Sequence, residues 1–388
     1  MLFLGLDGVS FFKLVLTGLV WVSFFIAFYE YIKYQKDFKE VIPYAAYIVL
    51  TLLLSWNVIN VFRSIINKDG PITTILGNVS ASLAILVPFV IIFSLHKINL
   101  RAIHKYFLTV LTFGILFFTI ITILKGRDLN LAQSFTILLL FSPVSFLIPG
   151  LLLETKKNWI IIIVSIILLS YAANLFVSRT NLIRLAMLII SFCGLFVFYK
   201  FRFKWILPLS CFVLVVPFFL LQQSYVTGES AFEKYLGDDD NVNNVDTRTF
   251  LYVELYEDLI NTNRMLIGKG GSGSYYSDYF YNSDVNETYN RNLIEVGILG
   301  ILLKGGIIAV VLNLTLLFIS IYNAFFKSNN LYTIGIGYVL LVHTILLFLE
   351  NVIVYSSYNF FIWFFVGVCL SKKIRGLSNN QIKAVLKT

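Results

Sequence analysis

Apolar runs of about 18 to 25 residues recur along most of this chain, separated by short clusters of charged residues. A helix of that length spans the hydrocarbon core of a bilayer, which is roughly 30 Å thick. The composition agrees, because 58% of the 388 residues are apolar and only 13% are charged. Soluble domains have roughly 25% charged residues. The pattern therefore predicts an all-α integral membrane protein with about eleven transmembrane helices, within a range of about 10 to 12.

The predicted spans alternate with short loops except in one place. They cover residues 12–31, 41–62, 71–95, 106–124, 131–153, 159–177, 181–199, 205–222, 301–325, 331–349 and 352–370. The exception is a long polar region, residues 223–300, that holds most of the 21 acidic residues. We divide the chain accordingly into an N-terminal helix bundle (1–222), a large loop or cap (223–300), C-terminal helices (301–370) and a tail (371–388).

Basic residues are unevenly distributed over the short loops. One set of alternating loops, together with the C-terminal tail, contains most of the 30 lysines and arginines. Since positive residues favour the cytoplasmic side, we expect the tail in the cytoplasm and the large loop outside, periplasmic or extracellular. The net charge of +9 does not indicate nucleic-acid binding, because the basic residues form no long stripe.

The large loop contains signals for an amphipathic helix and for turns. A helix capped by Asp246 is predicted, with an apolar face that lies on the membrane or over the bundle. The residues of that face are Leu251, Tyr252, Leu255, Tyr256 and Leu259. The glycine cluster Gly268–Gly273 does not match the phosphate-loop pattern, so ATP binding is not expected. No motif for a metal site or a serine hydrolase is present, and no cofactor is expected.

Three arginines near the outer side are candidate anion ligands. Arg179 and Arg184 lie where two predicted helices meet, and such arginines either extend to the interface or bind an anion. The planar fork of arginine suits a phosphate or diphosphate. Arg248 follows an acidic string, where a surface salt bridge to Asp246 or Glu254 is the alternative role.

Two carboxylates precede the apolar entry of the span that follows the loop. Glu287 and Glu295, with Tyr289 and Arg291 between them, are expected where the loop meets the lipid headgroups. They form either a solvated rim or a site in which one carboxylate, its pKa raised by partial burial, acts as general base.

A histidine lies in the middle of a predicted span. His343 and Glu350 are seven residues apart, which predicts one shared helical face near the outer end. Intramembrane ionisable groups are functional candidates, and a structural core histidine is the equally supported alternative.

In order along the chain, these features resemble the bacterial O-antigen polymerase and O-antigen ligase superfamily, which includes the Wzy-type polysaccharide polymerases. The features are the pair Ser178-Arg179, Arg248 followed by Tyr252, the turn from Asn263 to Gly270, and the segment Tyr289–Gly300 leading into the next span. The helix with His343 and Glu350 also fits the C-terminal part of that family. The resemblance covers roughly residues 170 to 355, and its weight comes from the order of the features and their topology.

The resemblance implies a metal-independent, inverting glycosyltransferase of the membrane-embedded C-type fold in the bacterial inner membrane. Its partners would be membrane lipid, an undecaprenyl-diphosphate-linked oligosaccharide and a chain-length regulator. The roles that it implies are substrate binding by Arg179, Arg184, Arg248, Tyr252, Tyr289, Arg291 and Glu350, and catalysis by Glu287, Glu295 or His343. The ligase branch has a His-Asn pair where this chain has Asn286-Glu287, which favours a polymerase. A ligase, a flippase or other transporter, and a non-catalytic sensor are the alternatives.

Overall fold

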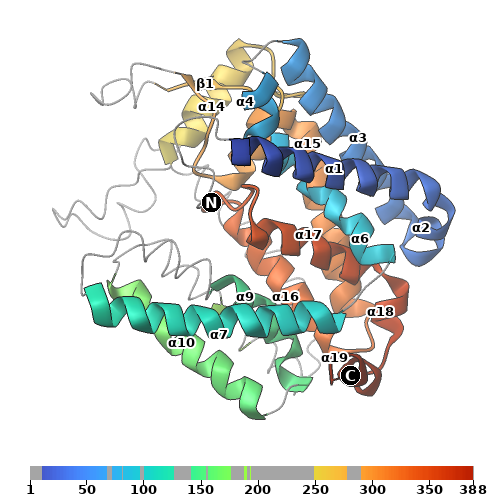
Figure 1. Cartoon of the computed structure of the whole chain (residues 1–388). Helices are drawn as coiled ribbons and strands as arrows, with labels where there is room; N and C mark the ends of the chain where they lie inside the picture. Colours follow the sequence, from blue (N-terminus) through green and yellow to red (C-terminus); the bar gives the residue numbers. More distant parts are fainter. Residues whose placement is uncertain are drawn as a thin grey trace.

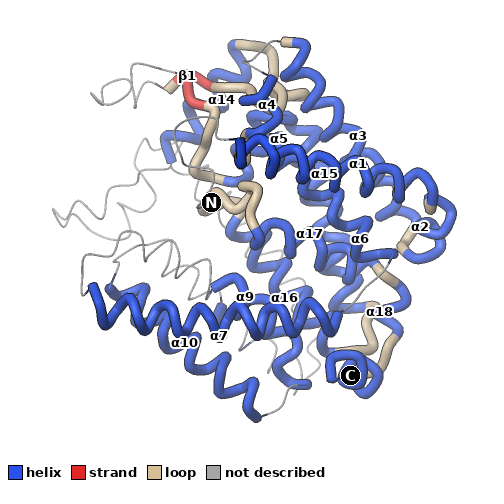
Figure 2. The backbone as a smooth tube through the Cα atoms, in the orientation of Figure 1, coloured by secondary structure: helices blue, strands red, loops and turns tan. Residues whose placement is uncertain are grey.

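The computed structural model describes residues 11–67, 72–80, 82–96, 100–125, 141–153, 156–175, 188–189, 193, 249–277 and 290–387. Within these residues the chain is a bundle of α-helices with one two-stranded antiparallel ladder (Figures 1 and 2). The ladder pairs β1 (Tyr275–Tyr276) with β2 (Asn290–Arg291). The predicted all-α class is confirmed.

The helices before the large loop form two groups in Figure 1. The first group is α1 (Phe11–Lys33), α2 (Gln35–Val41), α3 (Tyr44–Ile66), α4 (Ile72–Gly77), α5 (Ser82–Leu86), the 3-10 turn η1 (Val87–Phe89) and α6 (Val90–His96). The second is α7 (Leu100–Lys125), α9 (Ser142–Leu147), η3 (Ile148–Leu153) and α10 (Lys156–Leu175). The helices after it are α14 (Thr249–Asn261), α15 (Gly297–Phe326), α16 (Leu331–Leu346), α17 (Ser357–Leu370), α18 (Lys372–Gly376) and α19 (Asn379–Lys387).

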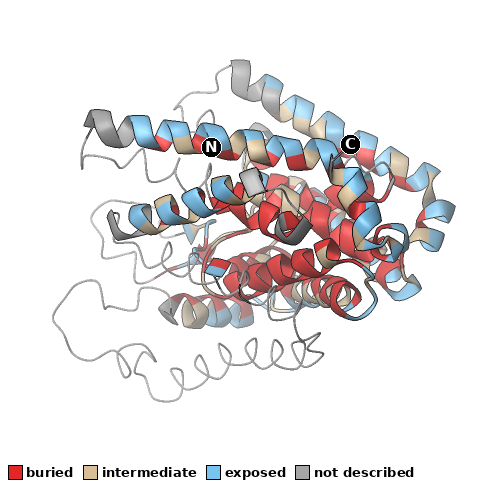
Figure 3. Cartoon of the chain, turned by 90° about the horizontal axis from the view of Figure 1, so that it is seen from below, coloured by how far each residue is buried: buried red, intermediate tan, exposed pale blue. Residues whose placement is uncertain are grey.

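Three helices of the described part are long and apolar enough to cross a membrane: α3, residues Leu100–Ile120 of α7, and α15. Four shorter apolar segments accompany them: Ser82–Leu95, Asn158–Tyr171, α16 and α17. The outer faces of the peripheral helices are exposed (Figure 3). Apolar residues lie on these faces, as Leu52 and Phe62 of α3 do at 53% and 58% exposure. Apolar side chains on both the inner and the outer face are typical of a helix in contact with lipid. The chain is a membrane protein, although the described helices support fewer spans than the expected eleven or so.

Three predicted spans have different boundaries in the structure. The span expected at 71–95 is interrupted after α4, and its second part contains the 3-10 turn around Pro88, whose ring disfavours a regular helix. α16 ends at Leu346 instead of 349. α17 begins at Ser357 instead of 352, because the Ser356 hydroxyl accepts a hydrogen bond from the Asn359 backbone N–H and caps the helix. The described part of the span expected at 131–153 is α9 followed by η3, and residues 131–140 lie outside the described part of the chain. The spans expected at 181–199 and 205–222 lie outside the described helices.

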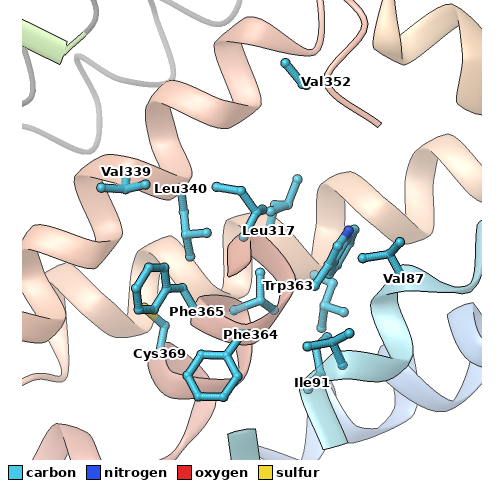
Figure 4. Packing of buried hydrophobic residues seen from close by; sticks show 14 of the residues in the cluster. Val87, Ile91, Leu317, Val339, Leu340, Val352, Trp363, Phe364, Phe365 and Cys369 are labelled. Atoms are coloured by element: carbon cyan, nitrogen blue, oxygen red, sulfur yellow. The ribbon is translucent and has the colours of Figure 1, made fainter. Parts of the chain in front are cut away.

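The centre of the bundle is formed by α15, α16, α17 and α6, which pack through large apolar side chains (Figure 4). Leu340 and Phe365 are completely buried, and Trp363 of α17 points toward Val87 and Ile91. Lipid chains are as apolar as these side chains, so van der Waals contact between closely packed helices contributes most of their association.

α15 is broken at Gly306, which has a φ of 67°. The turn Asn263–Gly273, named here the glycine turn, fills the break. The N–H groups of Ile307 and Ile308 donate to the carbonyls of Met265 (3.0 Å) and Leu266 (3.3 Å). On the other side of the break, the Leu303 and Lys304 carbonyls accept from the N–H groups of Lys269 (2.7 Å) and Gly270 (3.0 Å). Irregular backbone is tolerated in a membrane protein where the protein itself satisfies it, and the glycine turn does so here.

The predicted turn from Asn263 to Gly270 is confirmed. Asn263, Gly268 and Gly270 all have positive φ angles, of 53°, 68° and 97°. Position 268 also has no room for a side chain, because a Cβ there would lie 2.5 Å from the Gly306 nitrogen. Glycine is the one residue that combines this backbone conformation with so close an approach.

The basic tail meets two predicted cytoplasmic loops at the opposite end of the bundle. Lys372 Nζ donates to the Glu40 carbonyl (3.0 Å), and the Arg375 guanidinium donates to the Lys327 carbonyl (3.3 Å). These contacts bring the tail close to the two loops, so the three basic segments lie near one another in the fold.

Candidate functional site

The loop helix α14 lies over the bundle. Leu251, Leu255 and Leu259 are buried, as the pattern of the sequence predicted, whereas Tyr256 is half exposed. The Tyr252 hydroxyl donates to the Phe348 carbonyl (2.8 Å), which ties α14 to the turn after α16. Tyr252 therefore has a fastening role in the structure, in addition to the substrate-binding role that the resemblance implies.

A cluster of charged and phenolic groups lies beside α14, at the entry to α15. We call Glu254, Tyr275, Arg291 and Glu295 the rim cluster. The β1–β2 ladder places Tyr275 opposite Arg291, and the Arg291 guanidinium lies 3.8 Å from the Glu295 carboxylate. Glu254 accepts a hydrogen bond from the Ser277 hydroxyl (2.7 Å). An arginine and two carboxylates are thus gathered where the loop enters the membrane helix.

Burial and charge have opposite effects on the phenol of the rim cluster. Burial raises the pKa of Tyr275 to about 12, and the nearby Arg291 guanidinium offsets this only in part. Tyr275 therefore stays protonated at neutral pH and is available as a hydrogen-bond donor. Glu295, by contrast, has 45% of its side chain exposed, so the partial burial predicted for a general base is small at this position.

Glu350 does not share a helical face with His343, contrary to the sequence prediction, because α16 ends at Leu346. Glu350 is buried in the following turn, and this turn caps α15. The N–H groups of Gly297 and Ile298 donate to the carbonyls of Glu350 (3.0 Å) and Leu347 (2.7 Å). The first N–H groups of a helix have no partner within it, so the turn satisfies two of them.

His343 lies in a different place from the rim cluster. It lines a cavity of about 50 Å³ inside the bundle, between α3, α15, α16 and α17. The polar residues that line this cavity, named here the core cavity, are Asn57, Asn60, Lys304, Asn313, His343 and Asn359. Of the residues predicted to form the site, His343 alone is among the lining residues that the structure describes.

Sequence reasoning missed Lys304, which is 4% exposed in the first half of α15. The sequence does contain a signal for this residue, because a lysine in an otherwise apolar membrane helix is a functional candidate by default. It also missed the role of Arg63, whose guanidinium donates to the carbonyls of Ile267 (2.6 Å) and Gly268 (2.7 Å) and to Asn60 Oδ1 (2.9 Å). Those carbonyls are about 200 positions along the chain from Arg63, so no local pattern reveals the contact.

The remaining predicted site residues lie outside the described part of the chain. These are Arg179, Arg184, Arg248, Glu287 and Tyr289. Within the described ranges, no group of three or more His, Cys, Asp or Glu side chains is arranged to hold a metal ion.

No protein-family model fits the chain, and no curated protein is significantly similar to it.

Arg63→Ala should loosen the glycine turn. The substitution leaves the two part-buried carbonyls without their charged donor, at an expected cost of about 3 kcal/mol, since a hydrogen bond to a charged group contributes about 1.5–3 kcal/mol. The measurement is the thermal unfolding midpoint of the protein purified in detergent. Arg264→Ala is the matched control, because Arg264 is an exposed arginine of the same turn. Equal midpoints for the two variants would show that the hydrogen bonds from Arg63 to the glycine turn, called here the Arg63 clamp, contribute nothing to stability.

Proposed function

We propose that this protein polymerises undecaprenyl-diphosphate-linked oligosaccharide repeat units into O-antigen, capsule or exopolysaccharide on the outer face of the bacterial inner membrane. The observation that carries the proposal is the placement of the rim cluster. An arginine, two carboxylates and a buried phenol are held by α14 and a β ladder at the entry to a membrane helix. A lipid-linked substrate has its polar head at that depth, beside the outer ends of the helices.

The chemistry is a glycosyl transfer with inversion in a membrane-embedded glycosyltransferase of the C type. An acceptor hydroxyl attacks the anomeric carbon, the bond from that carbon to the lipid diphosphate breaks, and the acceptor proton passes to a base. Arg179 and Arg248 stabilise the negative charge that grows on the leaving diphosphate. Glu287 is the first choice for the base, followed by Glu295 and His343. The exposure of Glu295 supports access to substrate, whereas His343 is almost fully buried.

Topology and partners follow from the same proposal. The large loop is periplasmic or extracellular, the tail is cytoplasmic, and a chain-length regulator in the membrane is the expected protein partner. Arg291 and Tyr252, with Arg184 and Tyr289, contact the sugar or its diphosphate, whereas Glu350 is buried in the turn that caps α15. No cofactor enters the reaction, since the lipid diphosphate is itself the activated leaving group.

Transport of lipid-linked sugars is the second candidate, and one observation favours it. α15 is discontinuous at Gly306, and two ionisable residues, Lys304 and His343, are buried in the bundle. Broken helices and intramembrane ionisable groups are typical of secondary transporters. In this chain, however, the glycine turn occupies the break, so the free helix ends do not face an open pathway.

Reconstitution into liposomes tests both functions. A polymerase given lipid-linked repeat units yields a ladder of products on a gel. A ligase transfers glycan to a different acceptor lipid and yields no ladder from repeat units alone. Movement of the substrate across the bilayer without lengthening would contradict the polymerase and support the transporter.

A further inference from the structure

The core cavity contains a buried cation with no counter-ion among the described residues. Lys304 is 4% exposed, and its ammonium makes no hydrogen bond or ion pair within the part of the chain that the structure describes. Among the described residues that line the cavity, none is an aspartate or a glutamate. An isolated charge inside a membrane protein costs several kcal/mol, so such residues pair with an opposite charge or bind a ligand.

Two other polar atoms in the walls of the cavity also lack a partner. His343 Nδ1 and Asn359 Oδ1 are buried and make no hydrogen bond within the described part, and both residues are 1% exposed. The Asn359 amide is held in place, because its Nδ2 donates to the Ile353 carbonyl (3.1 Å). Its oxygen therefore remains an acceptor for a ligand hydroxyl. Buried polar groups in proteins nearly always have a partner, so these atoms indicate a missing one.

Size and position restrict the ligand. The cavity measures about 50 Å³, and one water needs about 10–15 Å³ on this scale, so a few waters or a compact anion fit. Lys304 is about 10 Å along α15 from Gly297, given the rise of about 1.5 Å per residue. The site is thus inside the bundle and separate from the rim cluster.

From these observations we propose that the core cavity binds a phosphoryl group, with Lys304 as the charge partner and with Asn359 and His343 as hydrogen-bond partners of its hydroxyl. The cation requires charged oxygens, and the acceptor Asn359 Oδ1 requires a donor on the same ligand. Inorganic phosphate near neutral pH carries both, and a phosphomonoester carries both when it binds as its singly protonated monoanion. Sulfate has charged oxygens without a hydroxyl, and chloride has neither group. The phosphoryl group comes either from free phosphate or from a lipid monophosphate.

The test is the thermal unfolding midpoint of the full-length protein in detergent. Inorganic phosphate or a short polyisoprenyl monophosphate should raise it by about 5 °C at roughly a hundredfold excess over the Kd. Sulfate and chloride at equal concentration should have much smaller effects. A shift with phosphate indicates a free-anion source, and a shift with the isoprenyl phosphate alone indicates a lipid source.

Two lysine variants complete the design. Lys304→Met should abolish the shift and, without ligand, be at least as stable as the wild type, because a buried unpaired charge is removed. Lys373→Met is the control, since Lys373 is exposed on α18. The proposal is overturned if neither phosphate source shifts the wild type, if sulfate matches phosphate, or if the shift persists in Lys304→Met. Should Lys304→Met fail to accumulate, calorimetry of phosphate binding to the wild type decides. None of these measurements requires polymer synthesis, so they are independent of the proposed function.

Discussion

Gly306→Ala should leave little correctly folded protein in the membrane. Gly306 has a φ of 67° and a ψ of −170°, a combination that is essentially restricted to glycine and costs another residue about 1–3 kcal/mol. A Cβ at this position would also collide with the Leu266 carbonyl and lie 2.5 Å from the Ile267 nitrogen. Both obstacles are backbone atoms, which cannot rotate away, and overpacking adds about 1–3 kcal/mol. The sum is a large part of a total stability of about 5–15 kcal/mol.

The measurement is the yield and monodispersity of the variant after membrane extraction. Gly18→Ala is the control, because nothing lies within 4 Å of a Cβ built at that position in α1. Alanine also favours a helix by about 1 kcal/mol over glycine, so this control should accumulate as the wild type does or better. Normal yield and an unchanged midpoint for Gly306→Ala would show that the glycine turn does not occupy the break in α15.

Arg179→Ala and Arg248→Ala should each abolish long polymers while the protein remains in the membrane. If the two guanidinium groups hold the leaving diphosphate, removal of either should lower the rate by about 10²–10³, the usual effect of deleting one charge-stabilising donor. The measurement is the length distribution of the glycan on a gel, normalised to the amount of protein in the membrane.

Lysine at the same positions separates charge from geometry. A lysine keeps the positive charge and loses the planar fork, so Arg179→Lys and Arg248→Lys should retain part of the activity if charge dominates and little if two-point contact is needed. Arg264→Ala, an exposed arginine of the glycine turn, should leave the polymer unchanged. Normal chain length in either alanine variant would rule out the assigned diphosphate site.

Helices were the most predictable part of this protein. α1, α3, α10 and α15 match predicted spans within four residues, because a run of about 20 apolar residues has few alternatives to a membrane helix. The loop helix α14 was also predicted, from the spacing of Leu251, Leu255 and Leu259. These are local signals, since each depends on residues within one or two helical turns.

The candidate site was predictable in part. The segment with Arg291 and Glu295 was expected at the entry to a membrane helix, and the structure places both residues in the rim cluster there. The prediction that His343 and Glu350 share one helical face was wrong, because the spacing of two residues predicts a shared face only if the helix continues through both. Its end at Leu346 depends on how the following turn packs against the N-terminus of α15.

By itself, the sequence determined that the chain forms apolar helices suited to a membrane, because hydrophobicity and helix length are properties of consecutive residues. The break in α15, the Arg63 clamp and the core cavity around Lys304 were decided by the tertiary structure alone. Each depends on groups that are far apart in the chain, such as the Leu266 carbonyl beside Gly306 or Asn57 facing the same cavity as Asn359. The satisfaction of a buried polar group is a property of its surroundings in space, and no local pattern specifies those surroundings.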